Sequence, residues 1–136
     1  MLKGVNWIAV LVSVVVLEIV GFLWYAVIFQ QVWMAALGAP QDPKPMAVAQ
    51  TLGMINTLII VIGIDWLLRR LNVAGLAATV TAALTAWLFF DFTTMAIDYF
   101  YVGHTATLVL INMGYQLVAY ALAGAVFGLA PRKAAA

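Results

Sequence analysis

The chain has 136 residues, of which 67% are hydrophobic and 8% are charged, and its formal net charge at pH 7 is +1. A soluble domain of this length keeps roughly 25% charged residues, so the composition excludes a water-facing domain and predicts an integral membrane protein that contacts membrane lipids. The small net charge predicts no nucleic-acid partner, and the absence of cysteine together with a single histidine predicts no metal site.

Four apolar stretches are each long enough to cross the hydrocarbon core of a bilayer, which takes about 20 residues in a helix. We predict membrane spans at residues 5–28, 47–68, 76–96 and 107–129. Together they predict an all-α membrane protein with one domain, residues 1–136, in which four transmembrane helices form an antiparallel up-down bundle.

The first span, residues 5–28, carries Glu18 near its centre. Its 15 Val, Ile, Leu and Phe residues contribute at most about −4.5 to −9 kcal/mol to insertion, whereas a central carboxylate costs about 2.5 to 3.5 kcal/mol. The span therefore inserts despite the carboxyl group, and insertion does not explain its presence. One turn later Gly21 is a helix-packing candidate, while Trp24 and Tyr25 are predicted anchors at the outer interface.

The segment after the first span is the most irregular part of the chain. In "QQVWMAALG" the apolar residues recur at helical spacing, and Gly38 is a natural stop. Either the first span overshoots the bilayer, or a short helix lies along the interface with Trp33 as its anchor. "APQDPKP" then holds three prolines and predicts a turn or an extended segment.

The basic residues are divided unevenly between the two sides of the bundle. Five of the six lie on the side that holds both termini and the second loop: Lys3, Arg69, Arg70, Arg132 and Lys133. Lys44 lies on the other side. The positive-inside rule therefore predicts a multi-pass protein of the bacterial inner (cytoplasmic) membrane with both termini in the cytoplasm. Asp65, four residues before Arg69, is expected to form an ion pair with it.

Polar side chains inside the spans are the candidate functional residues, because an unpaired polar group that faces lipid costs several kcal/mol. By depth, six of them can meet in the outer half of the bundle: Glu18, Asn56, Asp91, Asn112, Tyr115 and Gln116. Two interpretations stay open. The group either satisfies its own hydrogen bonds and sets helix register, at about 0.6 kcal/mol per bond, or it lines a polar cavity around Glu18 and Asp91.

In the fourth span, Gly124 and Gly128 form a G-x-x-x-G pattern and are further helix-packing candidates. Such a pattern lets two helix backbones approach closely. The neighbour is either another helix of the same bundle or a helix of a second copy.

No catalytic arrangement is recognisable, because the sequence has no HExxH, no P-loop and no base near its one serine, Ser13. We therefore expect no enzyme activity and no cofactor, while a bound lipid or other apolar ligand is compatible with the composition. The first hypothesis is a non-catalytic protein that packs against other transmembrane helices, either as an accessory or structural subunit of a membrane complex or as a homo-oligomer. The alternative is small-molecule binding or proton-linked transport through the polar cavity.

Two stretches, "NWIAVLVSVVVLEIVGFLWYAVIFQQVWMAALG" and "INMGYQLVAYALAGAVFGL", resemble the bacterial DUF1761 family of small membrane proteins. The resemblance rests on Asn6, Trp7, Gly21, Trp24, Tyr25, Phe29, Trp33, Gly114 and Tyr115. The chain departs from the family pattern at Gln30, where a Gly is common, and at Gln116, where a His is common. The family has no established activity, so the resemblance implies a four-span bundle and no mechanism.

Overall fold

The structure is a computed structural model that describes residues 3–39 and 44–130. In chain order its elements are α1 (Trp7–Phe22), η1 (Leu23–Ile28), α2 (Gln30–Leu37), α3 (Met46–Arg70), α4 (Leu76–Ala86), η2 (Trp87–Phe92), α5 (Thr93–Ile97), η3 (Asp98–Val102) and α6 (Ala106–Leu129). The three η segments are π-helical turns. All secondary structure in the described ranges is helical, which confirms the all-α part of the predicted fold class.

Four continuous helical stretches are long and apolar enough to cross a membrane: Trp7–Ile28, Met46–Arg70, Leu76–Val102 and Ala106–Leu129. They overlap the four predicted spans and confirm that each is a helix of sufficient length and apolar character. Two earlier expectations fall outside the described residues, namely the turn in the middle of "APQDPKP" and the contribution of Arg132 and Lys133 to the charge balance.

The third helical stretch, Leu76–Val102, is longer than the predicted span of residues 76–96, and the difference is a correction. The sequence "DYFYV", residues 98–102, lies between the predicted third and fourth spans, yet it forms η3. The helix ends only at Gly103, whose φ of 85° is left-handed and whose N–H donates to the carbonyl oxygen of Asp98. A helix commonly ends where a residue adopts the left-handed conformation, and glycine adopts it most easily. The helix therefore ends at Gly103 and not at Asp98.

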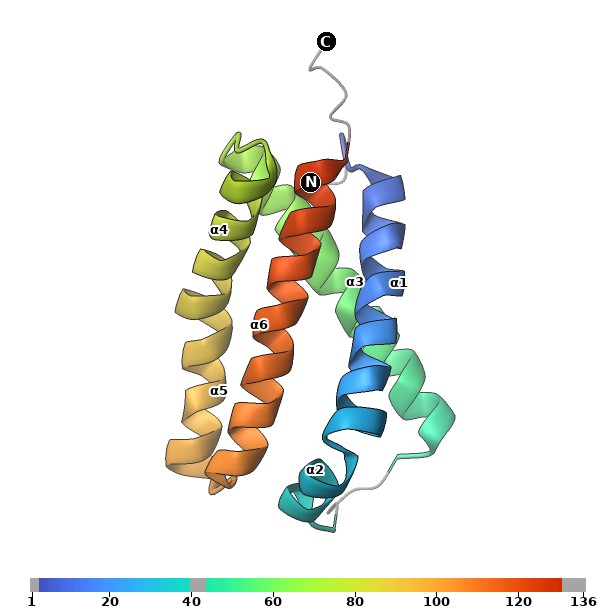
Figure 1. The fold of residues 1–136 in the computed structure, drawn as a ribbon, viewed down its shortest axis with the longest axis vertical. Helices are drawn as coiled ribbons and strands as arrows, with labels where there is room; N and C mark the ends of the chain where they lie inside the picture. Colours follow the sequence, from blue (N-terminus) through green and yellow to red (C-terminus); the bar gives the residue numbers. More distant parts are fainter. Residues whose placement is uncertain (1–2, 40–43, 131–136) are drawn as a thin grey trace.

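The short helix predicted in "QQVWMAALG" is confirmed as α2, and it ends at Gly38 with a φ of 69°. Phe29 separates it from η1 with φ −108° and ψ 8°, so α2 is a distinct helix and not an overshoot of the first span. Figure 1 shows α2 turned away from the axis of α1 at the end of the bundle opposite the start of α1.

The start of α1 and the ends of α3 and α6 lie together at one end of the bundle, which we call the terminal end; the other is the α2 end (Figure 1). At the terminal end the predicted ion pair is confirmed, with 2.8 Å between Nε of Arg69 and Oδ2 of Asp65. Arg69 also donates from Nη1 to the carbonyl oxygen of Lys3 at 3.1 Å. The arginine thereby ties the end of α3 to the segment before α1.

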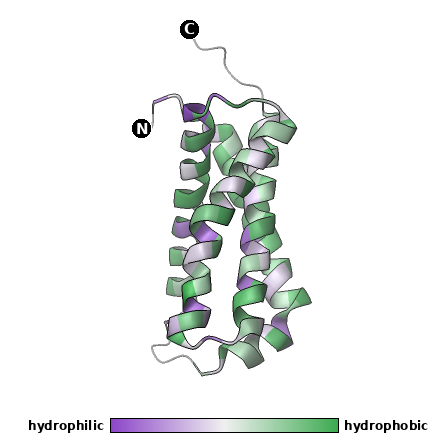
Figure 2. Cartoon of the chain, turned by 90° about the vertical axis from the view of Figure 1, so that its left-hand side faces the viewer, coloured by the Kyte–Doolittle hydropathy of each residue, from purple (hydrophilic) through white to green (hydrophobic). Residues whose placement is uncertain are grey.

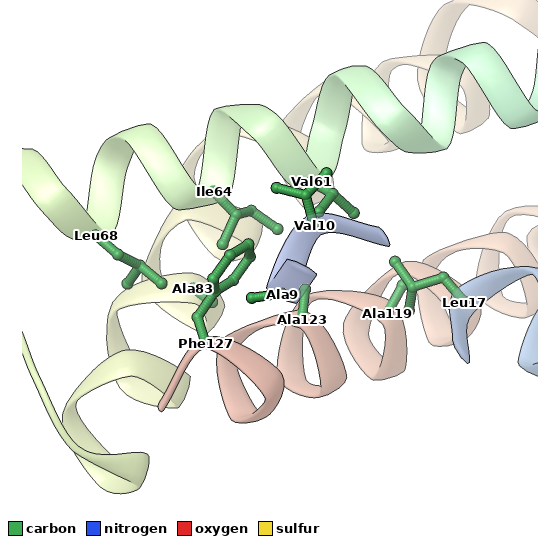
Figure 3. Close-up of a cluster of buried hydrophobic side chains, with 10 residues drawn as sticks. All are labelled: Ala9, Val10, Leu17, Val61, Ile64, Leu68, Ala83, Ala119, Ala123 and Phe127. Atoms are coloured by element: carbon green, nitrogen blue, oxygen red, sulfur yellow. The ribbon is translucent and has the colours of Figure 1, made fainter. Parts of the chain in front are cut away.

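The core lies where α1, α3, α4 and α6 meet (Figure 3). Its members are mostly aliphatic, and several are alanines: Ala9, Val10, Leu17, Val61, Ile64, Leu68, Ala83, Ala119, Ala123 and Phe127. The most extensive contact between two helices is that of α4 with α6. Small side chains let these helices approach closely, which matters inside a membrane because lipid gives helices no hydrophobic reason to associate.

The first half of α3 makes little contact with the rest of the bundle. Every residue from 46 to 56 is exposed, whereas Val61, Ile64 and Leu68 in its second half are buried. Figure 1 shows α3 crossing behind α1 and diverging from α6 toward the α2 end. Hydrophobic residues run along the full length of the long helices (Figure 2), as a lipid-facing surface requires.

Candidate functional site

A cavity of about 290 Å³ lies between α1, α3 and α6, on the side where α3 diverges. Four of the six predicted polar residues line it: Glu18 from α1, Asn56 from α3, and Tyr115 and Gln116 from α6. The remaining wall is largely apolar and includes Leu17, Phe22, Ile60 and Ala119. Three helices therefore bring polar side chains to one site whose other walls are largely apolar.

Among the residues that the structure describes, Glu18 is the only acidic one in the cavity lining, and no basic one lines the cavity. The carboxyl group is half-buried. In the described part of the chain it makes no hydrogen bond or ion pair, and neither do the side-chain amides of Asn56 and Gln116. These three groups therefore retain their hydrogen-bonding capacity for a molecule that enters the cavity.

Tyr115 forms a wall of the cavity, and its position depends on a glycine of α1. The Tyr115 hydroxyl donates to the carbonyl oxygen of Leu17 at 3.1 Å. A Cβ atom added at Gly21 would lie 3.0 Å from the Tyr115 oxygen. The missing side chain of Gly21 thus lets the phenol ring cross α1 and reach the backbone.

Asn112 does not line the cavity, and it joins three elements at the α2 end. Its side-chain oxygen accepts from the Tyr25 hydroxyl and from Nε1 of Trp33, both at 3.2 Å. One amide of α6 therefore binds η1 and α2 together. The Tyr25 ring also contacts the rings of Trp33 and Tyr115, with both centroid distances at 5.2 Å.

Trp24 makes a second contact with α6, at the residue directly before Asn112. Its Nε1 donates to the carbonyl oxygen of Ile111 at 3.0 Å, and a Cβ added at Gly114 would lie 3.0 Å from its ring. Two glycine–aromatic fits, Gly21 with Tyr115 and Gly114 with Trp24, therefore hold α1–η1 against α6. The wider π-turn of η1, with an i→i+5 bond from the N–H of Phe29 to the oxygen of Trp24 at 2.9 Å, carries both adjacent aromatic residues of this contact.

We call the set Gly21, Trp24, Tyr25, Phe29, Trp33, Asn112, Gly114 and Tyr115 the aromatic joint. The sequence predicts three of its members, Trp24, Tyr25 and Trp33, as anchors at the membrane interface. In the structure their polar atoms bond to α6. Inspection of single spans misses this role, because the acceptors on Ile111 and Asn112 lie about 80 to 90 residues away in the chain.

Asp91 does not line the cavity, so the predicted cavity shared by Glu18 and Asp91 is corrected. Asp91 belongs to η2, which packs against α6 from the α4 side. Its Oδ2 atom and Nε1 of Trp87 are buried and have no hydrogen-bond partner in the described part of the chain. The helical segments that carry the two carboxyl groups pack on different sides of α6, which separates Asp91 from Glu18.

The glycine pattern of α6 explains why α4 lies on that side. A Cβ at Gly124 would lie 2.9 Å from the carbonyl oxygen of Thr79, and one at Gly128 would lie 2.8 Å from Cα of Leu76 and still closer to the Thr79 hydroxyl. The structure therefore places both glycines at a backbone contact within the bundle. The Thr79 hydroxyl donates to the carbonyl oxygens of Gly75 and Leu76, at 3.0 and 3.1 Å.

Taken together, the fold and its cavity define a small, all-helical protein with four helices long and apolar enough to span a membrane. A family model matches residues 8–128, and the chain belongs to that family, DUF1761, described as a protein of unknown function. Neither the curated proteins nor the solved structures compared with the chain gave a match.

The residues that carry the family resemblance have a shared structural place. Seven of the nine belong to the aromatic joint and are linked by ring or glycine contacts: Gly21, Trp24, Tyr25, Phe29, Trp33, Gly114 and Tyr115. An eighth, Asn6, caps α1 by accepting from the N–H of Ala9 at 3.2 Å. Gln116, where the chain departs from the pattern, lines the cavity beside them.

Proposed function

We propose that the chain is a non-catalytic, multi-pass membrane protein that binds a small molecule in the cavity between α1, α3 and α6. The observation that carries the proposal is the convergence of Glu18, Asn56 and Gln116, from three helices, on one cavity. Polar groups at membrane depth are costly unless they are paired. A bound molecule that pairs with them would offset that cost.

The competing interpretation, in which the polar group only sets helix register, requires that its members bond to one another. Tyr115 satisfies that requirement through Leu17. Glu18, Asn56 and Gln116 do not, because within the described residues no hydrogen bond joins them to one another or to the backbone. This difference favours binding over a purely structural role.

Two glycines of α3 allow a matched test of binding. A Cβ at Gly53 or at Gly63 would have no atom within 4 Å, yet only Gly53 lines the cavity. The protein would be purified in mild detergent, and its bound small molecules would be identified by native mass spectrometry. We expect wild type and Gly63→Leu to retain a bound molecule and Gly53→Leu to lose it. An empty wild-type cavity, or equal occupancy in both variants, would overturn the proposal.

We further propose that the four helices cross the bacterial inner membrane antiparallel to one another, with both termini in the cytoplasm. The close contact of Lys3 with Arg69 at the terminal end supports this orientation through the positive-inside rule. Because the chain has no cysteine, single cysteines report sidedness cleanly. In intact spheroplasts a membrane-impermeant maleimide should label His104→Cys and should leave Ala74→Cys unlabelled until the cells are permeabilised. The reverse pattern would refute the orientation.

A second candidate function is association with further transmembrane helices, in a homo-oligomer or in a larger membrane complex. The exposed first half of α3 favours it, because Gln50 and Thr51 place polar side chains on a part of the helix that the chain does not cover. A single cysteine at Gln50 should form a disulfide-linked species in native membranes, whereas one at Phe90, exposed on η2, should not. A monomeric mass with no cross-link at Gln50 would count against association through α3.

A further inference from the structure

We infer that the ligand of this cavity is a small organic cation, an amine or a quaternary ammonium compound that carries apolar groups; the inference rests on the proposed function. The first argument is charge. Glu18 is the only charged side chain that the described residues contribute to the lining, and a carboxylate inside a membrane is costly without an opposite charge close by. The cavity offers none of its own, so a cationic ligand would supply it and an anionic one would be repelled.

The second argument is the aromatic wall. The rings of Tyr25, Tyr115 and Phe22 line the same cavity as Glu18. The Tyr25 and Tyr115 centroids are 5.2 Å apart with their planes inclined at 57°, so the two rings form a corner. Aromatic rings attract cations, and quaternary ammonium ligands are commonly bound by such sets of rings.

The third argument is the balance of donors and acceptors. The Tyr25 hydroxyl donates a hydrogen bond to the side-chain oxygen of Asn112, and the Tyr115 hydroxyl donates one to the carbonyl oxygen of Leu17. Both hydroxyl protons are therefore used inside the protein, and the phenol oxygens can only accept from a ligand. The amides of Asn56 and Gln116 can either donate or accept. The two phenol oxygens and the Glu18 carboxylate only accept, so they favour a ligand that donates hydrogen bonds or carries positive charge.

The fourth argument separates an organic cation from a metal ion. Hard cations such as Ca²⁺ take about six to eight oxygen ligands, whereas Glu18 is the one carboxylate at the cavity. Across the described ranges no three His, Cys, Asp or Glu side chains come together. Leu17, Ile60 and Ala119 supply apolar wall, and a volume of about 290 Å³ holds an organic molecule far better than a bare ion.

The test compares a cation with a neutral molecule of the same shape. The full-length protein would be placed in nanodiscs of zwitterionic lipid, and the binding of labelled benzyltrimethylammonium would be measured by equilibrium dialysis against empty nanodiscs. Benzyldimethylamine N-oxide, which has no net charge, would serve as the competitor. We expect the cation to bind at least about tenfold more tightly than the N-oxide, because a contact with a charged partner is lost in the latter.

Two acid-to-amide variants give a matched control, since both carboxyl groups lie in membrane-spanning helices but only Glu18 lines the cavity. We expect Glu18→Gln to weaken binding of the cation about tenfold or more, and Asp91→Asn to leave it unchanged. If the N-oxide binds as tightly as the cation and Glu18→Gln has no effect, the ligand class is wrong and the binding function stands. If neither compound binds and wild type also purifies empty, the proposed function fails with it.

Discussion

The two ends of the bundle are held together by different means. At the terminal end, alanines and glycines such as Ala9, Ala83 and Gly124 let helix backbones meet. At the α2 end, large rings and hydrogen bonds hold η1 and α2 against α6, with Tyr25 and Trp33 both bonded to Asn112. Close packing of small residues leaves no room for a ligand, whereas the aromatic joint stands beside a cavity.

The difference shows that one short chain can hold its helices together in two ways. Inside a membrane, helices associate through close van der Waals packing and through interhelical hydrogen bonds. The terminal end uses mainly the first and the α2 end mainly the second. The following four predictions test this division, in order of decreasing expected effect.

The largest effect is expected where two backbones are closest. Gly128→Leu would drive a side chain into Leu76 and Thr79 of α4, and we expect a loss of about 3 kcal/mol in the free energy of unfolding. The measurement is an SDS titration in mixed micelles followed by far-UV circular dichroism. Gly63→Leu is the control, because a Cβ there has open space. Equal stability of the two variants would show that the α4–α6 contact is not as close as described.

At the α2 end, the corresponding change removes an acceptor. Asn112→Leu leaves the Tyr25 hydroxyl and Nε1 of Trp33 without their shared partner, and we expect a loss of about 2 kcal/mol. Gln50→Leu also replaces an amide by leucine, but on the exposed face of α3, so it should change stability little. The same titration compares the two, and a loss no larger than that of the control would refute the role of Asn112.

The glycine–aromatic fit predicts a coupling between two positions. Gly21→Ala places a Cβ about 3.0 Å from the Tyr115 oxygen, and we expect it to cost about 1 kcal/mol. In a Tyr115→Phe background that oxygen is absent, so the same substitution should cost about 0.5 kcal/mol less. A double-mutant cycle of unfolding free energies measures this coupling. Strict additivity would show that the two residues do not constrain each other.

The smallest effect on stability is expected for the buried hydroxyl group of Ser13 in α1, which makes no hydrogen bond in the described part of the chain. Ser13 is 0% exposed, and its hydroxyl has no hydrogen-bond partner in the described chain. Ser13→Ala should therefore leave the free energy of unfolding within about 0.5 kcal/mol of wild type, because no bond is broken. A loss above about 1 kcal/mol would reveal a hydrogen bond that the structure does not contain.

Much of the secondary structure could be predicted from local signals, with one clear failure. Gly38 ends α2 as expected, and Asp65 pairs with Arg69 one turn away. The predicted end of the third span, at residue 96, is wrong, because the helix continues through Asp98 and ends only at Gly103. A polar residue does not end a helix, whereas a residue that adopts a left-handed φ does.

The candidate site could be predicted only in part. Depth along the membrane correctly suggested that Glu18, Asn56 and Gln116 lie near one another, and the structure brings them to one cavity. Depth did not reveal on which side of α6 each neighbouring helix packs, so it wrongly grouped Asp91 with them. Nor did it show that Asn112 is engaged by two aromatic side chains.

What the sequence by itself determined is the number of helices and their apolar character, because hydrocarbon surroundings require each backbone to satisfy its hydrogen bonds within its own helix. What only the tertiary structure decided is the position of each helix around α6. Gly124 and Gly128 admit α4 on one side, while Gly21 and Gly114 admit aromatic rings on the other. These are contacts between residues distant in the chain, and they separate Asp91 from Glu18 and leave a cavity beside the carboxyl group of Glu18.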